Sequence, residues 1–247
     1  MNKKEIVKKS EKKQSLKGRA AQVGLSKAQV VAAAIAQIDE RGLAKFSIRE
    51  LARTLGVSTA VVYWHTNGKK ADLFAEISAS ITSTFDQDVD EQGDWKETIR
   101  SIFRRYRTLV LQHPNVAPLL GGEMKSNGVA NIRWVEVVLA ALANAGFKGE
   151  QQKDAFNALI GGLAGFVTME LAPAPTEQTQ DWKDSFSQRI TEIDAEQFPH
   201  THGALPVVTN RIFVLRWQNG SDVSYDASFE FLMNSLIEGL ALSIQEN

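Results

Sequence analysis

The stretch FSIRELARTLGVSTAVVYWHTNGKKADLF, from Phe46 to Phe74, decides the fold. Ser47 begins a short helix and Glu50 follows three residues later, a spacing that lets each side chain pair with a free backbone N–H at the helix start. The next apolar residues recur at helical spacing and predict one buried face, formed by Ile48, Leu51, Ala52 and Leu55. Gly56 then permits a sharp turn, and Ser58 can cap a second helix. The pattern predicts a helix-turn-helix.

The second helix of this motif, Thr59 to Trp64, is too short to be stable alone. It needs the preceding helix as a platform, which is how a recognition helix is held for insertion into the major groove of DNA. Tyr63, Trp64 and His65 are expected to lie partly at the surface, because Val62 must face inward. The alternative is a generic pair of amphipathic helices with a glycine between them.

The run LGVSTAVVYWHTNGKKADL resembles the signature of the tetracycline-repressor (TetR) family of bacterial transcription regulators. The YWH triplet and the lysine four residues after His65 are especially similar to the tetracycline repressors. Arg49 matches a family position that can reach a guanine. Phosphate contacts are matched by Ser47, His65 and Lys69. With Trp64 of the aromatic triplet, the candidate DNA-binding residues are Ser47, Arg49, Thr59, Ala60, Val61, Tyr63, Trp64, His65 and Lys69.

One of these positions departs from the family pattern. Thr59, Ala60, Val61 and Tyr63 match positions where the family meets bases or backbone in the major groove. Val61 replaces a polar residue that is common there in the tetracycline repressors. An isopropyl group cannot hydrogen-bond, but it can pack on a thymine methyl group. We therefore expect an operator sequence that differs from theirs.

The composition favours a globular cytoplasmic protein. Of 247 residues, 43% are apolar, which is ordinary for a soluble chain. The longest apolar runs fall short of the roughly 20 residues that a membrane span needs, so no membrane contact is expected. The absence of cysteine removes disulfides and thiolate metal sites, and it suits a reducing compartment.

A net charge of −1 hides a strong asymmetry. Residues 1–75 carry 15 Lys+Arg against 6 Asp+Glu, whereas the remaining residues carry 13 against 23. A basic end on an acidic body indicates that only the first part meets nucleic acid. Residues 1–20 have few apolar positions and are expected to be a flexible basic arm. This arm either serves as a solubilising tail or lies along the DNA, as some arms do in a minor groove.

The predicted fold is all-α, with an arm at 1–20, a three-helix DNA-binding domain at 21–75 and a larger ligand-binding and dimerisation domain at 76–247. Ser26 opens the first helix, and Gln29 completes a capping box there. The helices expected in the second domain span residues 95–112, 131–145, 151–171, 181–195 and 229–244. The segment 211–225 instead favours a small β-hairpin around Asn219-Gly220.

Two of these helices are too apolar to have a water-facing side. Residues 151–171 contain Gly161, Gly162 and Gly165, and residues 229–244 are rich in phenylalanine and leucine. A helix that is apolar on more than one face needs a partner on each. The pattern predicts a homodimer with a four-helix interface around a two-fold axis, in which Leu236 is buried.

The residues that could carry chemistry do not form a catalytic or metal site. His200 and His202 are two potential ligands without an acidic or cysteine partner at ligand spacing, and they are expected in an exposed loop. Glu170 is expected to be a surface carboxylate at a helix end. His113 before Pro114 suits the negative end of a helix. We expect no enzyme activity, no metal and no cofactor.

The segments DWKETIRSIFRRYR, HPNVAPLL and ANAGF resemble the ligand-binding domain of the same family. Leu120 occupies the position at which tetracycline repressors hold the drug-bound magnesium with a histidine. Leucine cannot ligate a cation, so the effector is expected to differ from magnesium–tetracycline. The candidate effector pocket, whose members could equally be plain core, consists of Phe103, Tyr106, Met124, Trp134, Phe156, Phe166 and Met169.

The sequence therefore predicts a homodimeric DNA-binding regulator, a repressor released from a double-stranded inverted-repeat operator by an apolar or amphipathic small molecule. Two alternatives stay open. An enzyme or small-molecule-binding protein with an attached DNA-binding domain would need convergent polar groups. A sequence-tolerant DNA-architectural protein would need basic charge throughout the chain.

Overall fold

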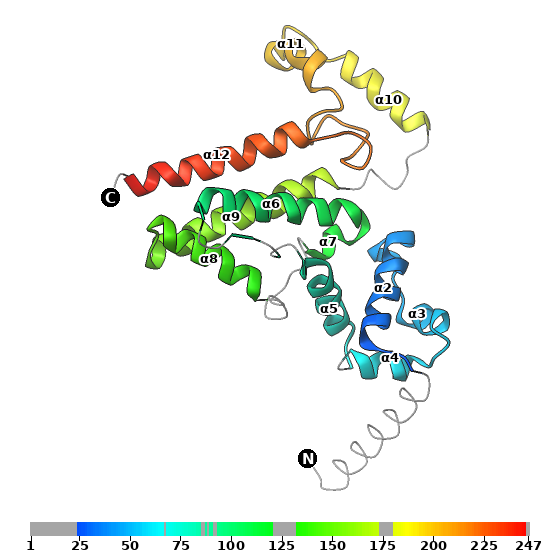
Figure 1. The fold of residues 1–247 in the computed structure, drawn as a ribbon. Coiled ribbons are helices and arrows are strands. Elements are labelled where there is room, and N and C mark those ends of the chain that lie inside the picture. Colours follow the sequence, from blue (N-terminus) through cyan, green and yellow to red (C-terminus); the bar gives the residue numbers. More distant parts are fainter. Residues whose placement is uncertain are drawn as a thin grey trace, which may run out of the picture. The chain divides into compact units, whose positions relative to one another are not determined.

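The computed structural model describes residues 24–66, 68–84, 87, 89–90, 93–120, 132–172 and 180–245. Within this part of the chain every regular element is a helix, which confirms the predicted all-α fold (Figure 1). The elements are α2 (Lys27–Arg41), η1 (Leu43–Lys45), α3 (Ile48–Thr54), α4 (Thr59–His65), α5 (Lys70–Thr82), α6 (Trp95–Gln112), η2 (Pro114–Val116), α7 (Ala117–Leu120), α8 (Arg133–Ala145), α9 (Gly149–Glu170), α10 (Gln180–Thr191), α11 (Pro199–Val208) and α12 (Asp226–Gln245). The predicted arm at 1–20 lies outside the described residues.

The chain divides into two compact units. The first comprises residues 1–88 and 112–137, and the second comprises residues 89–111 and 138–247. The first unit thus takes in a segment beyond the predicted division at residue 75. The reason is hydrophobic: η2 packs on α2 and α7 packs on α5, which buries Val116, Leu119 and Leu120.

The first unit is organised around α2. Ser26 and Gln29 form the predicted capping box, in which the Ser26 N–H donates to Gln29 Oε1 at 2.7 Å and the Gln29 N–H donates to Ser26 Oγ at 3.2 Å. The buried face of α2 consists of Val30, Val31, Ala34 and Ile38. This face packs against α3, α4 and α5, so α2 is the support on which the helix-turn-helix rests.

The second unit places α6, α9 and α12 side by side (Figure 1). The inner face of α12 is apolar, with Phe229, Met233 and Ile237 all buried. The helix approaches α9 closely at Gly162, where an added Cβ atom would lie 2.6 Å from Leu236 Cδ1. Leu236 therefore contacts its own protomer.

A row of charged pairs joins α12 to α6. Lys96 Nζ lies 2.6 Å from Glu238 Oε2, and Arg100 Nε donates to Asn234 Oδ1 at 3.1 Å. The guanidinium of Arg104 makes two hydrogen bonds, of 2.8 and 2.7 Å, to the carboxylate of Glu230. One side of α12 thus contacts α6 and another packs against α9. The third side, which carries Phe231 and Leu242, is exposed.

The predicted hairpin at 211–225 is wrong. The segment, which we call the strap (residues 209–224), forms turns and bends rather than strands. Asn210 has a positive φ of 59°, and its Oδ1 accepts hydrogen bonds from the backbone N–H groups of Trp217 and Gln218 at 3.0 and 3.1 Å. A side chain therefore takes the donors that a β-ladder would need.

The segment before the strap is helical where a loop was predicted. His200 and His202 lie exposed on α11, which has Pro199 at its first position, a residue whose fixed φ suits a helix start. The helix predicted at 181–195 is present as the shorter α10. No residue of α11 is buried, so this part of the second unit has little core of its own.

Candidate nucleic-acid interface and effector-domain core

The helix-turn-helix predicted from the quoted stretch is present as α3, a tight turn and α4. Ser47 caps α3 by accepting a hydrogen bond from the Glu50 N–H at 3.4 Å. Gly56 has a φ of +66°, which L side chains rarely adopt, and it lets Val57 donate to the Ala52 carbonyl at 2.9 Å. The glycine thus turns the chain sharply enough to bring α4 against α3.

The other half of the predicted capping box is absent, because the Glu50 carboxylate is used elsewhere. It forms an ion pair with Arg41 at the end of α2, and it accepts hydrogen bonds from Arg53 at 3.3 Å and from Gln37 at 3.4 Å. The hydrogen bond from Arg41 lowers the pKa of Glu50 below its ordinary value. Glu50 therefore ties α2 to α3.

The predicted DNA-binding residues differ in their accessibility. Four of them are exposed in the structure: Arg49, Thr59, Ala60 and Lys69. Four more are half-buried: Ser47, Tyr63, Trp64 and His65. Thr59 and Ala60 form the first turn of α4, the part of a recognition helix that reaches base edges. All eight can be reached from outside the domain.

Val61 is the exception, because little of its surface is open to the thymine contact that was predicted for it. Its side chain is only 5% exposed, and Val62 beside it is fully buried. A helix of seven residues needs both valines to hold it on the domain. The resemblance identified a position along the chain, whereas burial depends on which face of α4 meets α2 and α3.

His65 contributes to this surface as a neutral group. Burial lowers the pKa of His65 from its ordinary 6.5, and its Nε2 atom is buried without a hydrogen-bond partner. The ring packs edge-on against Trp64, with centroids 4.6 Å apart. Near pH 7 the imidazole is therefore uncharged, and a phosphate contact from it would be a neutral hydrogen bond.

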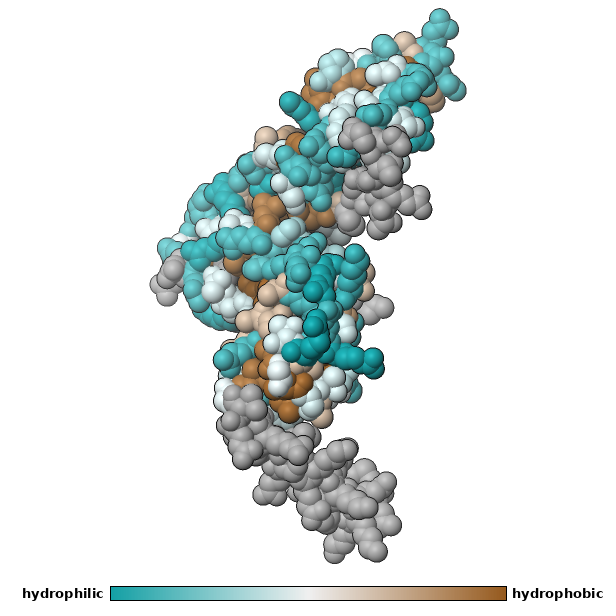
Figure 2. All heavy atoms as spheres, turned by 90° about the vertical axis from the view of Figure 1, so that its right-hand side faces the viewer, coloured by the Kyte–Doolittle hydropathy of each residue, from teal (hydrophilic) through white to brown (hydrophobic). Residues whose placement is uncertain are grey.

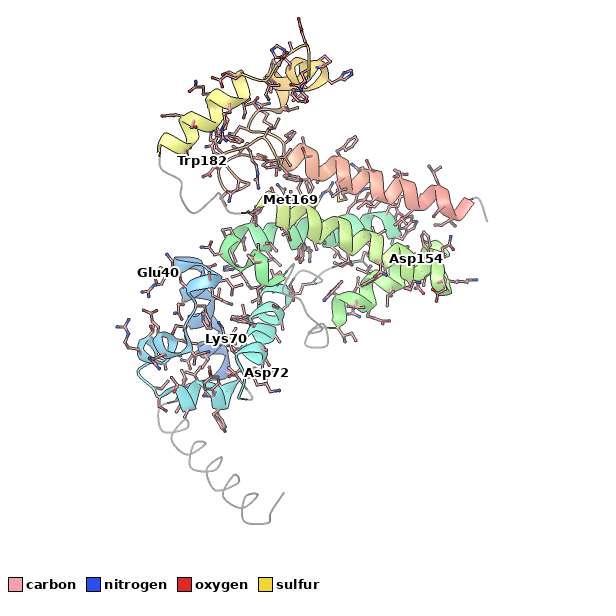
Figure 3. The ribbon with its side chains drawn as sticks, turned by 180° about the vertical axis from the view of Figure 1, so that it is seen from behind. Glu40, Lys70, Asp72, Asp154, Met169 and Trp182 are labelled. Carbon is pink, nitrogen blue, oxygen red and sulfur yellow. The ribbon has the colours of Figure 1, made fainter. Side chains whose placement is uncertain are left out.

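The two adjacent lysines have different surroundings. Lys70 (labelled in Figure 3) has its Nζ atom 5.3 Å from the centroid of the Phe46 ring and 4.9 Å from that of Phe74, so this cation packs on the two aromatic residues that flank the motif. Lys69 is exposed at the N-cap position of α5. The contact of Lys70 with these two rings was not predicted, although the phenylalanines at both ends of the stretch from Phe46 to Phe74 could have indicated it.

The residues of the predicted effector pocket are divided between the two units, and the pocket stays a prediction. Phe103 and Phe166 are buried in the second unit, and burial raises the pKa of the half-buried Tyr106 to about 12. Phe156 is half-buried. Met169, at the end of α9, is 41% exposed (Figure 3). Trp134 belongs to the first unit, and Met124 lies outside the described residues.

Glu170 is fully buried, which corrects its expected place at the surface. Arg107 of α6 donates to both carboxylate oxygens of Glu170, at 2.9 and 2.7 Å, and to Asp226 Oδ1 at 2.7 Å. The Arg107 guanidinium also lies 4.8 Å from the centroid of the Phe229 ring. A hydrogen bond from Arg107 lowers the pKa of Asp226. The sequence feature that could have predicted this buried ion pair is Arg107, because it lies four residues after Phe103 and therefore on the same buried face of α6.

The described residues contain no group of three or more histidine, cysteine or acidic side chains that could hold a metal ion. His113, expected at a helix end, pairs with Asp39 of α2, with Nδ1 and Oδ2 2.7 Å apart. Leu120 is 1% exposed and is a core residue of the first unit.

A supported helix-turn-helix with an exposed first turn, joined to a second helical unit, defines a DNA-binding transcription regulator. The model of the bacterial regulatory proteins of the tetR family matches residues 30–77. The model of the tetracyclin repressor-like C-terminal domain matches residues 89–244, more than half of the chain. The chain belongs to the tetracycline-repressor (TetR) family.

Individual relatives agree with this assignment. The class G tetracycline repressor protein of Vibrio anguillarum is 26% identical over 216 residues, which cover 87% of this chain and 93% of that protein. A possible TetR family transcriptional regulator from Streptomyces coelicolor A3(2) has the same fold, with a TM-score of 0.70, 21% identity, and coverage of 88% of this chain and 100% of that one. The regulator BioQ, solved with its double-stranded DNA operator, has a TM-score of 0.59 at 24% identity, with 88% and 99% covered.

Proposed function

We propose that this regulator is a cytoplasmic homodimeric repressor without catalytic activity, which binds an inverted-repeat operator and leaves it when a small molecule binds the second unit. The observation that carries the proposal is the exposed first turn of α4, where Thr59 and Ala60 are held at the surface by the buried Val61 and Val62. An exposed Lys69 supplies charge for a phosphate at the edge of the same surface.

The second unit offers a surface for a second copy of the chain. Among the described helices, α12 alone is long and apolar enough to cross a membrane, yet only 17% of that window is buried within the protomer. Its outward face carries Phe231 and Leu242, which are 76% and 62% exposed. On the face drawn in Figure 2, apolar residues form exposed patches among the hydrophilic ones. Covering α12 with a partner removes this apolar area from water.

The neighbouring helix α9 fits the same arrangement. Gly161 and Gly165 are exposed and meet nothing within 4 Å of an added Cβ, so they leave room for side chains of a partner. Leu236, in contrast, lies against Gly162 of its own protomer. The proposed interface therefore rests on Phe231 and Leu242 rather than on Leu236. A two-fold axis through it would place two recognition helices about 34 Å apart, one turn of DNA.

The effector is proposed to differ from magnesium–tetracycline. Leu120 has no lone pair for a cation, and its side chain is enclosed in the first unit. We expect that adding tetracycline with magnesium leaves the operator complex intact in an anisotropy assay. Release at micromolar drug would contradict this part of the proposal.

Selection of duplexes from a random pool tests the proposed function. The full chain should enrich sequences with two inverted half-sites, whose centres lie about 10 base pairs or a multiple of this apart. Enrichment of single, unsymmetrical sites would contradict a dimeric repressor. Uniform retention of all sequences would indicate DNA packaging instead.

A further inference from the structure

We propose that Tyr225 is an effector-binding residue, whose hydroxyl pairs with the polar group of a neutral aromatic ligand, and that the strap covers this site. The inference rests on the proposed function, because it assigns a ligand class and a contact to the effector site of the second unit. Tyr225 was not among the residues predicted for the pocket.

The hydroxyl of Tyr225 is a buried hydrogen-bonding group without a partner. The residue is 3% exposed, and its oxygen makes no hydrogen bond. The other such side-chain atoms among the described residues belong to Gln37, Asp39 and His65, all in the first unit. Leaving a buried hydroxyl unpaired costs free energy that a bound acceptor or donor would recover. This atom therefore marks the point in the second unit where a polar ligand group is needed.

The surroundings of Tyr225 are aromatic. Phe213 of the strap stacks on its ring, with centroids 5.2 Å apart and planes 23° apart. Phe166 of α9 packs edge-on against Phe213 at 5.2 Å and against Phe229 of α12 at 5.5 Å. These four residues form an aromatic cluster that joins two helices and the strap. A flat aromatic ligand can continue both the stacked and the edge-on contacts of such a cluster.

The two arginines beside the aromatic cluster already use their guanidinium groups in hydrogen bonds, which favours a neutral ligand. Arg107 is used by Glu170 and Asp226. Arg216 lies 5.7 Å from the centroid of the Tyr225 ring, and it donates to backbone carbonyls at the end of α9, including that of Glu170 at 2.8 Å. An anionic ligand would have to break one of these pairs, whereas a neutral hydroxyl or carbonyl group would not.

The strap is the part of this site that can open at least cost. No residue from Thr191 to Ser224 is buried, whereas Phe166 and Phe229 of the helices are, so moving the strap uncovers Phe213 but disturbs less of the core than moving a helix would. Besides the ring contact of Phe213 with Phe166, two polar groups hold the strap to the end of α9: the Arg216 guanidinium and the Gly220 N–H, which donates to the Glu170 carbonyl at 2.8 Å. Gly220 fits there because an added Cβ would lie 2.3 Å from Glu170 Cγ. Displacing the strap removes Phe213 from the Tyr225 ring and gives a ligand access.

Two probes that differ by one hydroxyl group test the site. The affinities of 2-naphthol and naphthalene are measured by fluorescence titration of the full chain without DNA, for the wild type and for Tyr225→Phe. The preference for 2-naphthol should be about three- to tenfold greater in the wild type than in Tyr225→Phe. Tyr63→Phe, on the DNA-binding helix, should keep the wild-type preference. An equal preference in the wild type and Tyr225→Phe, or binding of neither probe to the wild type, would overturn the proposal.

Two further measurements separate this site from other roles. Because the Tyr225 hydroxyl makes no bond in the free protein, Tyr225→Phe should melt at the wild-type temperature or above it, and a lower melting temperature would assign the hydroxyl to the fold instead. Operator affinity without probe should be the same in both proteins. If the probe titration fails while operator binding persists, the site is wrong and the proposed repressor function still stands.

The role of the strap is tested by binding kinetics. Arg216→Ala removes the guanidinium that holds the strap to α9, so stopped-flow association of 2-naphthol should become at least about threefold faster. Arg211→Ala, at an exposed arginine of the same strap, should leave the rate unchanged. An unchanged or slower association in Arg216→Ala would show that the ligand does not pass beneath the strap.

Discussion

Arg107 and Glu170 are joined by two hydrogen bonds although they lie 63 residues apart, and the Glu170 carboxylate is fully enclosed by the second unit. Removing one member leaves the other as a buried, partly uncompensated charge. We expect Glu170→Ala to lower the free energy of unfolding by about 3–5 kcal/mol, measured by urea denaturation.

A surface pair in the same unit provides the control for this prediction. Arg104 and Glu230 are 51% and 38% exposed, so Glu230→Ala should cost about 1 kcal/mol or less. The double variant Arg107→Met, Glu170→Leu should recover most of the lost stability, because no buried charge then remains. Equal effects of Glu170→Ala and Glu230→Ala would contradict the burial of this pair.

The ion pair of Glu50 gives the first unit a dependence on pH. The hydrogen bond from Arg41 lowers the pKa of Glu50 below its ordinary 4.5. Since the folded pKa lies below the unfolded one, the pair stabilises the folded chain above pH 4.5, and this contribution is lost as the pH falls through the folded pKa. The melting temperature of the wild type should therefore fall more steeply on acidification than that of Glu50→Gln. Parallel curves in circular dichroism would refute the assignment.

Lys69 and Lys70 should respond differently to truncation. Lys69→Ala should weaken binding to all duplexes and reduce the slope of log affinity against log salt by about one unit, because it removes one phosphate contact. Lys70→Ala should leave that slope unchanged and lower the melting temperature, since Lys70 packs on Phe46 and Phe74. Fluorescence anisotropy at several salt concentrations measures both. A change in base preference with an unaltered slope in Lys69→Ala would contradict the assigned role.

The outward face of α12 should control assembly. Phe231→Arg places a charge where the proposed interface excludes water, so the variant should sediment as a monomer at micromolar concentration and bind the operator weakly. Thr108→Arg, on the exposed face of α6, should remain a dimer. A Phe231→Arg protein that sediments as the wild type does would exclude this face as the interface.

The parts of the fold that were predicted from the sequence depend on local signals. A cap at Ser47, a glycine with positive φ at position 56 and apolar residues at helical spacing act within a few residues of one another, and they located α3, the turn and α4. The family resemblance then gave the positions of the candidate DNA-binding residues. It could not give the burial of Val61, because burial depends on how α4 packs.

The parts that were not predicted depend on contacts between distant segments. The partner of Arg107 lies on another helix, and no local pattern pairs the two residues. The sequence of residues 211–225 predicts a hairpin because it suits strands, whereas in the structure the Asn210 side chain accepts hydrogen bonds from the backbone N–H groups of Trp217 and Gln218. The unpaired hydroxyl of Tyr225 could not be predicted either, because its burial depends on aromatic residues from other segments of the chain.

The most direct test is the number of protomers that bind one operator, because we propose a dimer that reads a two-fold-symmetric site. Sedimentation of the full chain with a selected duplex should give two protomers per inverted repeat, and a duplex cut to one half-site should bind at least about a hundredfold more weakly, since one recognition surface is then unused. A complex of one protomer with a half-site, formed as tightly as that with the full repeat, would contradict the account.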